Sequence, residues 1–286
     1  MTTVAQSLAA AHAQGLDRLD AQRLLLHVLG RRDAGRAWLI AHDADPLPPA
    51  APQQFADLCA RRARGEPLAY LTGEREFYGL TLQVDARVLD PRPDTETLVD
   101  WALQLPLPPD ARVIDLGTGS GAIALALAAQ RPGWQVHALD ASPDALAVAR
   151  ANAARLGLKV NFVHGHWLAD LADGPAPARG PYHAIVSNPP YIAAADPHLA
   201  ALAHEPLQAL ASGPDGLDDL RLIARQAPAH LAPGGWLLLE HGHDQASAVH
   251  ALLTTAGFTQ VQSRRDLPGI ERCSGGCWVG GGVGGG

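Results

Sequence analysis

Four consecutive residues, Asn188-Pro189-Pro190-Tyr191, carry groups that could hold a planar amino group. The asparagine side-chain oxygen and the Pro189 carbonyl are hydrogen-bond acceptors, so together they can accept both N–H bonds of one amide or amine. Proline has no backbone N–H, so the segment is biased toward acceptors. Tyr191 adds an aromatic face on which a flat amide or base can pack. Asn-Pro-Pro after an apolar run is also an ordinary turn sequence, so its meaning depends on the rest of the chain.

A glycine-rich turn supplies the second group of candidate residues. The segment Gly117-Thr118-Gly119-Ser120-Gly121 follows an apolar run, and its glycines let a ligand approach the backbone closely. Its spacing differs from the G-x-G-x-x-G pattern of dinucleotide sites. By itself the turn is compatible with either a dinucleotide or S-adenosylmethionine.

Asp140 ends the next apolar run and could accept both hydroxyls of a ribose. Such an acid also occurs in nicotinamide enzymes, and it could alternatively cap the helix that begins near Pro143. The Asn188–Tyr191 segment distinguishes between a nicotinamide dinucleotide and S-adenosylmethionine as the cofactor. Hydride transfer does not require a set of hydrogen-bond acceptors around a planar nitrogen, whereas methylation of that nitrogen does. We therefore expect S-adenosylmethionine.

The elements that must position these residues alternate along the chain. From residue 112 onward, short apolar runs alternate with helical patterns, which predicts a parallel sheet covered on both faces. In such sheets ligands bind at the carboxyl ends of the strands, where the glycine turn, Asp140 and Asn188 all fall. We expect strands at 113–116, 134–139, 160–163, 182–186, 236–240 and 258–263.

The chain divides into four predicted parts. Residues 1–75 show helical patterns and are expected to form a substrate-recognition domain, with a Thr3–Gln6 capping box on the first helix and Asp20 capping the second. Residues 76–108 are expected to form a hairpin and a linker helix, and 109–273 the catalytic domain. Residues 274–286 are rich in glycine and are expected to be a disordered tail.

Composition limits the partners. The net charge is −7, and residues 1–85 hold nine arginines and ten acidic residues, which is a poor electrostatic footprint for nucleic acid. The apolar run 122–129 is far shorter than the ~20 residues that span a bilayer. Three cysteines cannot all pair, which favours free thiols in a reducing cytoplasm. We expect no stable nucleic-acid binding, no membrane partner and a monomer.

Several motifs together resemble those of one enzyme family. The segments Asp115–Ala126, Pro91–Glu96, Val186–Ile192 and Leu238–Gly242 are similar to those of the PrmC/HemK family, and the resemblance covers about residues 20–272. That family methylates the glutamine of the Gly-Gly-Gln loop in class 1 peptide chain release factors. Asn-Pro-Pro-Tyr alone is shared with DNA and RNA methyltransferases, and its combination with Arg-Pro-Asp-Thr-Glu is much more specific.

The resemblance implies a fold, a reaction and a set of site residues. The fold would be α/β, a Rossmann-like class I S-adenosylmethionine-dependent methyltransferase domain with a seven-stranded, mostly parallel sheet, preceded by a helical bundle and a β-hairpin. The reaction would give N5-methylglutamine and S-adenosylhomocysteine. Asn188, Pro189, Pro190 and Tyr191 would hold and activate the substrate glutamine. The cofactor would lie against Gly117, Thr118, Gly119, Ser120, Gly121, Asp140, Trp167 and Asn188.

Three alternatives remain open on sequence alone. The Asn188 clamp would serve equally for an exocyclic amine of adenine or guanine in DNA or RNA, with Tyr191 stacking on a flipped base. A non-catalytic module could keep the cofactor fold, although the intact glycine turn, Asp140 and Asn188 speak against this. His164 with His166, and His241 with His243 and Asp244, have spacings that could suit a metal, but no third ligand is placed by a motif and we expect no metal.

Overall fold

The computed structural model describes residues 1–171 and 179–280. The chain forms two compact units, Met1–Glu74 and Arg75–Gly286. The hairpin and linker helix, which were expected to form a separate part, thus fall almost entirely within the second unit.

The first unit is a bundle of short helices around an aliphatic core. Its helices are α1 (Val4–Ala13), α2 (Arg18–Val28), α3 (Arg36–Ala41), α4 (Ala51–Ala63) and α5 (Leu68–Thr72). Leu24, Leu25 and Leu26 of α2 and Phe55 of α4 are buried in this core. Amphipathic helices this short are stabilised mainly by such packing rather than by their intrinsic propensity.

Two helix caps in this unit were predicted, and one prediction is wrong. The Thr3–Gln6 capping box on α1 is confirmed, with both reciprocal hydrogen bonds present. Asp17, not Asp20, caps α2 by accepting from the N–H groups of Leu19 and Asp20. The Asp20 carboxylate instead accepts from Arg62 Nε at 2.6 Å and so ties α2 to α4. An aspartate at either position can cap a helix, and the tertiary partner of Asp20 decides between them.

The second unit opens with a two-stranded sheet, β1 (Glu74–Phe77) and β2 (Leu80–Gln83). A 3-10 turn, η1 (Pro93–Thr95), then leads directly into helix α6 (Glu96–Gln104). This turn places Thr95, whose side chain is buried, at the amino end of α6.

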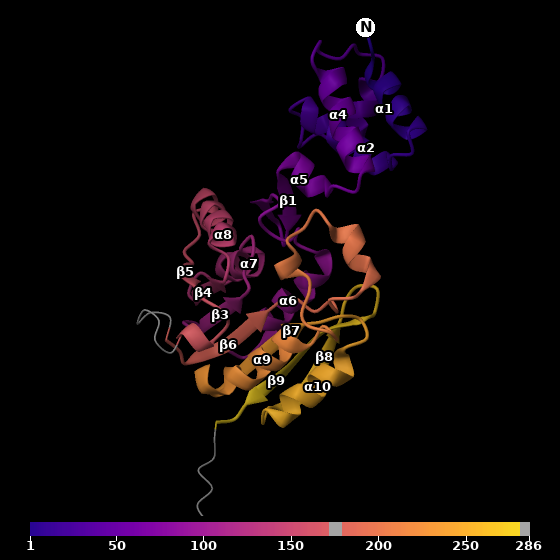
Figure 1. Ribbon diagram of the computed structural model, residues 1–286. Helices are drawn as coiled ribbons and strands as arrows, with labels where there is room; N and C mark the ends of the chain where they lie inside the picture. The colour runs from indigo at the N-terminus through magenta and orange to yellow at the C-terminus, as the bar shows by residue number, and fades with distance from the viewer. Residues whose placement is uncertain (172–178, 281–286) are drawn as a thin grey trace, which may run out of the picture. The chain divides into compact units, whose positions relative to one another are not determined.

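A seven-stranded sheet follows, in the order β5-β4-β3-β6-β7-β9-β8, and confirms the predicted fold class (Figure 1). Strand β9 is antiparallel to both of its neighbours, whereas the other pairings are parallel. The chain order reverses between β3 and β6, and ligands of doubly wound sheets bind at such a reversal. The strands are β3 (Arg112–Leu116), β4 (Gln135–Asp140), β5 (Asn161–His164), β6 (Tyr182–Ser187), β7 (Leu231–Glu240), β8 (Thr259–Arg265) and β9 (Glu271–Trp278).

Helices cover both faces of this sheet. Helices α9 (Asp218–Gln226) and α10 (Ala246–Thr255) pack against one face, over a core that includes Ile114, Ile185 and Leu237 (Figure 1). Helices α6, α7 (Ala122–Gln130) and α8 (Pro143–Leu156) also contact the strands. Because both faces are buried, the central strands appear in the sequence as near-continuous apolar runs.

The glycine-rich end of the chain corrects one prediction. Residues 274–278, expected to be disordered, belong to β9, which pairs with β7 and β8. An added Cβ at Gly275 would lie 2.5 Å from Leu238 Cδ2 and 3.0 Å from a ring carbon of Trp101. Glycine is therefore needed because neighbouring side chains approach the strand backbone closely. Residues 281–286 of the predicted tail lie outside the described residues.

This close packing predicts that Gly275→Ala destabilises the protein. Without a large shift of Leu238 or Trp101 the new methyl group has no space, so the free energy of unfolding should fall by about 1–3 kcal/mol. Urea unfolding followed by circular dichroism measures the change. Gln262→Ala is the matched control, because Gln262 pairs with Gly275 from β8 and is exposed, so it should shift stability by less than about 0.5 kcal/mol. Equal effects of the two substitutions would contradict the packing account.

Candidate active site

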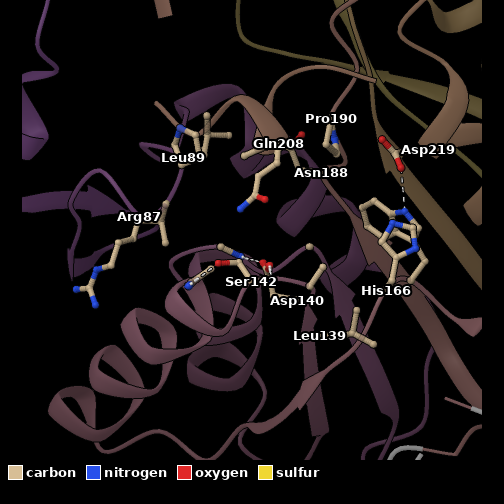
Figure 2. A pocket seen from close by; sticks show the side chains of 18 of the residues that line it. Arg87, Leu89, Leu139, Asp140, Ser142, His166, Asn188, Pro190, Gln208 and Asp219 are labelled. Carbon is tan, nitrogen blue, oxygen red and sulfur yellow. Dashed lines mark hydrogen bonds between the residues drawn. The ribbon is translucent and has the colours of Figure 1, made fainter. Parts of the chain in front are cut away.

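A cavity of about 360 Å³ lies at the carboxyl ends of β3, β4 and β6. Figure 2 shows Asp140 and Ser142 on one wall, Asn188 and Pro190 on the facing wall, and the Gln208 side chain between them. Of the residues expected at the site, the lining includes Gly117, Gly119, Asp140, Trp167, Asn188 and Pro190. Five others, all within the described part of the chain, are not in the lining: Thr118, Ser120, Gly121, Pro189 and Tyr191.

The conformation of the glycine turn explains why only some of its residues line the cavity. Gly117 and Gly119 have φ values of +69° and +54°, a left-handed conformation that L side chains rarely adopt. They expose backbone to the cavity, whereas the Thr118 side chain turns inward and donates to Asp115 Oδ2 at 2.6 Å. Ser120 is also buried, and its carbonyl accepts from Asn152 Nδ2. The turn thus presents backbone to a ligand and uses its hydroxyl residues to hold its own shape.

Asp140 links the turn to the following helix. Its Oδ2 accepts from the N–H of Gly119 and its Oδ1 from the N–H of Ser142, each at 2.8 Å. Ser142, not Asp140, is the N-cap of α8, because Ser142 Oγ accepts from the Ala145 N–H. Burial raises the pKa of Asp140, although these backbone N–H groups act in the opposite direction. Each carboxylate oxygen keeps a further lone pair that can accept a hydroxyl from the cavity.

Trp167 forms another wall beside the glycine turn. The residue is only 7% exposed, and an added Cβ at Gly117 would lie 3.3 Å from its ring. Its indole N–H donates to Asp219 Oδ1 at 2.9 Å, which fixes the plane of the ring. Its φ of 53° is rare for a bulky residue, and strained residues of this kind cluster at ligand sites.

Asn188 follows β6 and is oriented by a residue from a distant segment. Its Nδ2 donates to Thr95 Oγ1 at 3.2 Å, which leaves Oδ1 as the acceptor group of this cavity-lining residue. Tyr191 faces elsewhere: its ring packs against the core, and its hydroxyl donates to Glu240 Oε1 at 3.3 Å. Of the four residues Asn188–Tyr191, the cavity lining thus contains Asn188 and Pro190.

Sequence reasoning missed several residues of the site. Two wall segments, 87–89 and 206–209, carry no motif of their own and reach the cavity only through the tertiary fold. Thr95 lies in the Pro91–Glu96 motif, but no role at the acceptor site was assigned to it. Glu240 is the last residue of an apolar strand, as Asp140 is, and this shared position is a signal that could have identified it.

Asp115 lies under the glycine turn and is fully buried. Its Oδ2 accepts from Thr118 Oγ1 and the Ala124 N–H, while Oδ1 has no hydrogen-bond partner among the described residues. Burial raises the pKa of this carboxyl to about 7. The folded state therefore binds a proton that the unfolded chain has released, and the resulting stability is lost as pH rises through 7.

Asp115→Asn should remove this pH dependence. The amide can keep both accepted hydrogen bonds and place its NH₂ group where the unpaired oxygen lies. Between pH 5 and 8 the wild type should lose on the order of 2–3 kcal/mol more stability than the variant, since each pKa unit corresponds to about 1.4 kcal/mol. Urea unfolding at both pH values measures the difference. Asp110→Asn, at an exposed position, should behave as wild type; parallel pH curves for wild type and Asp115→Asn would contradict the assignment.

One histidine of each candidate pair contacts other groups, and the three cysteines are unpaired thiols. His164 Nε2 contacts the Ala141 carbonyl, and His241 contacts the Gly242 carbonyl and Ser274 Oγ. Within residues 1–171 and 179–280, no group of three or more His, Cys, Asp or Glu could hold a metal ion. Cys59, Cys273 and Cys277 are buried free thiols, in agreement with the free thiols that the cysteine count favours. None of the helices in the described part of the chain has the length and apolar character to span a bilayer.

Solved structures support the fold. A methyltransferase from Pyrococcus furiosus aligns with a TM-score of 0.54, covering 79% of this chain and 99% of that one. Its sequence identity is 18%, so the likeness concerns the fold alone.

Sequence comparison identifies the family. A model of the PrmC N-terminal domain matches residues 2–73, and a model of the methyltransferase small domain matches residues 94–213. A release factor glutamine methyltransferase of Bordetella pertussis is 53% identical over 265 residues, covering 92% of this chain and 95% of that protein. Another release factor glutamine methyltransferase, from Xylella fastidiosa, is 50% identical over 270 residues, covering 93% of this chain and 95% of that protein. With identity this high over nearly its whole length, the chain belongs to the release factor glutamine methyltransferase family.

Proposed function

We propose that this protein transfers a methyl group from S-adenosylmethionine to the side-chain amide nitrogen of the glutamine in the Gly-Gly-Gln loop of class 1 peptide chain release factors. The products are N5-methylglutamine and S-adenosylhomocysteine. Family membership supports the reaction, and the observation that carries it on the structure is the Asn188 carboxamide. Its nitrogen is held by Thr95, and its oxygen has no hydrogen-bond donor among residues 1–171 and 179–280, so it would accept from a substrate in the cavity that Asn188 lines.

On the donor side, the cavity has the features that a nucleoside-containing donor needs. The exposed backbone of Gly117 and Gly119 lets such a molecule approach closely, Asp140 can accept ribose hydroxyls, and the ring of Trp167 can flank adenine. When bound, S-adenosylmethionine supplies a methyl group on a positively charged sulfur. Thr118, Ser120 and Gly121 then act indirectly, by holding the turn in shape.

On the acceptor side, the problem is the weak nucleophilicity of an amide nitrogen, whose lone pair is delocalised into the carbonyl. Asn188 Oδ1 and the Pro189 carbonyl would each accept one N–H bond, which increases electron density on the nitrogen and directs it at the methyl carbon. As the new N–C bond forms and the C–S bond breaks, the nitrogen becomes acidic and releases its proton without a strong base. Orientation of this kind can supply up to ~7–11 kcal/mol of a barrier, and fixed dipoles stabilise the developing charge further.

The proposal extends to partners and compartment. We assign release-factor recognition to the helical unit, Met1–Glu74, which matches the PrmC N-terminal domain. The three buried free thiols are typical of a reducing compartment, which supports action in the cytoplasm. The net charge of −7 supports the absence of stable nucleic-acid binding. A monomeric state stays a prediction that sedimentation equilibrium would test.

A methyl-transfer assay with labelled donor tests the substrate. The purified protein is offered a class 1 release factor, the same factor with its loop glutamine changed to alanine, bulk RNA and bulk DNA. Label should enter only the unmodified release factor. Label on RNA or DNA, or label that survives the Gln→Ala change, would contradict the assignment.

A further inference from the structure

A buried carboxylate lies behind the acceptor wall. Glu240 ends β7, next to β6, and is 1% exposed. Its Oε1 accepts from the Tyr191 hydroxyl, while Oε2 is buried with no hydrogen-bond partner among the described residues. The Thr95 hydroxyl is close enough to help stabilise the charged form of this carboxylate. Glu240 is thus in contact with one residue of the Asn188–Tyr191 segment and with the residue that holds Asn188.

No cation pairs with this carboxylate in the described part of the chain. Arg272, whose field favours the charged form of Glu240, is paired with Asp266 at 3.2 Å and with Asp94 at 3.6 Å. Burying an unpaired carboxylate is costly, and an apolar or amide side chain would stabilise the fold better. A costly buried acid next to a cavity indicates a functional role.

The hydrogen-bond directions show what that role is. Thr95 has a single hydroxyl proton, and its oxygen already accepts from Asn188 Nδ2. An ionised Glu240 can only accept, so its interaction with the Thr95 hydroxyl would direct the Thr95 proton toward the carboxylate and leave the Thr95 oxygen for the Asn188 NH₂ group. Asn188 is then held with Nδ2 inward and Oδ1 toward the cavity. Without a fixed acceptor behind Thr95, the Asn188 carboxamide could turn over and present a donor to the substrate.

Tyr191 is fixed from the same side. Its hydroxyl contacts Glu240, and its carbonyl accepts from Gln245 Nε2 at 3.0 Å. Gln245 Oε1 in turn accepts from the Gly242 N–H, just beyond the end of β7. The Asn188–Tyr191 segment is therefore held at both ends by groups that converge on Glu240 and the turn that follows it.

We propose that Glu240 is a positioning residue for methyl transfer: through Thr95 it sets the direction of the Asn188 carboxamide, and through Tyr191 it holds the other end of the acceptor segment. This inference rests on the proposed function and deepens it by adding residues that act behind the acceptor site. Burial raises the pKa of Glu240 to about 7, so its charge changes within an accessible pH range. The titratable and charged groups that face it are Asp94, Tyr191, Arg272 and Cys273.

Two substitutions test the positioning role of Glu240, because each removes one partner of the interaction between Glu240 and Thr95. Glu240→Gln keeps the shape but replaces an acceptor with a donor, and Thr95→Val keeps the shape but removes the hydroxyl. Each should lower kcat on the release factor roughly ten- to a hundredfold while the Kd of S-adenosylmethionine changes less than about threefold, because neither residue lines the donor cavity. Thr95→Ser should restore kcat to within about threefold of wild type. Thr97→Val, two positions further along on α6 and outside the contacts that hold Asn188, is the matched control and should leave kcat unchanged.

The kcat of a double variant and the pH dependence of kcat distinguish a positioning role from a merely structural effect. If Glu240 acts on Asn188 through Thr95, the double variant Glu240→Gln with Thr95→Val should have a kcat no lower than that of the slower single variant. The wild-type kcat should rise with pH up to about 7, and this rise should be absent in Glu240→Gln. Should one variant fail to fold, the other still tests the link.

Different failures have different meanings. Wild-type kcat in Glu240→Gln, additive losses in the double variant, or failure of Thr95→Ser to recover activity would overturn this inference while leaving the proposed function intact. A folded wild type that binds the donor but methylates no release factor would overturn the proposed function, and this inference with it.

Discussion

Asn188→Ala should lower kcat/KM for release-factor methylation at least a hundredfold. The substitution removes the oxygen that would accept one N–H of the substrate amide, and deleting one preorganised hydrogen bond at a reacting group typically costs about 10²–10³ in rate. The Kd of S-adenosylmethionine should change much less, because the glycine turn, Asp140 and Trp167, which also line the cavity, stay in place. Steady-state kinetics on the release factor, with calorimetry for the donor, measure the two effects separately.

Asn161→Ala is the control for this prediction, because Asn161 lies exposed on β5 away from the cavity lining. It should retain wild-type kinetics. An Asn188→Ala variant with undiminished kcat/KM would contradict the acceptor role, and it would contradict the rival methylation of a nucleobase amine equally.

Asp140→Ala should raise the Kd of S-adenosylmethionine roughly ten- to a hundredfold, since hydrogen bonds to a charged group are each worth about 1.5–3 kcal/mol. The loss has two sources: the acceptor for ribose hydroxyls is removed, and the N–H groups of Gly119 and Ser142 lose their shared partner. Asp140→Asn keeps one acceptor oxygen and should fall between alanine and wild type. Isothermal titration calorimetry provides all three values.

Asp110→Ala serves as the control, because it removes an exposed carboxylate of the same unit that lies outside the cavity lining. Its donor affinity should equal that of wild type. If Asp140→Ala also bound the donor with wild-type affinity, the donor would have to occupy a different position from the one proposed.

The parts of the fold that follow from periodicity were predictable from sequence. Central strands buried on both faces are continuous apolar runs, and the residue that ends such a run lies at the ligand edge of the sheet. This rule was enough to place Asp140 and Asn188 on the wall of one cavity. It is local, so it needs no knowledge of how distant segments meet.

The end of the chain shows where composition is misleading. A glycine-rich segment usually lacks the side chains to form a core, and disorder was the reasonable expectation for residues 274–286. In β9 the same glycines are needed because Leu238 and Trp101 approach from neighbouring elements, which no local pattern reveals. Composition describes the segment, whereas the need for glycine comes from its neighbours.

The site shows a similar limit. Thr95 and Asn188 are 93 positions apart, and only the fold brings their side chains within hydrogen-bond distance. Tyr191 was expected to pack on the substrate, but its ring contacts the core and its hydroxyl contacts Glu240. Sequence therefore identified the residues at the ends of strands, and the structure supplied the contacts that orient them.

The most direct test of the central claim is mass spectrometry of the release factor after incubation with S-adenosylmethionine and this protein. We expect one added methyl group, located by fragmentation on the side-chain nitrogen of the Gly-Gly-Gln glutamine, and none when Asn188→Ala replaces the wild type. A methyl group on any other residue, or an unmodified release factor after incubation with folded, donor-binding wild type, would contradict the claim.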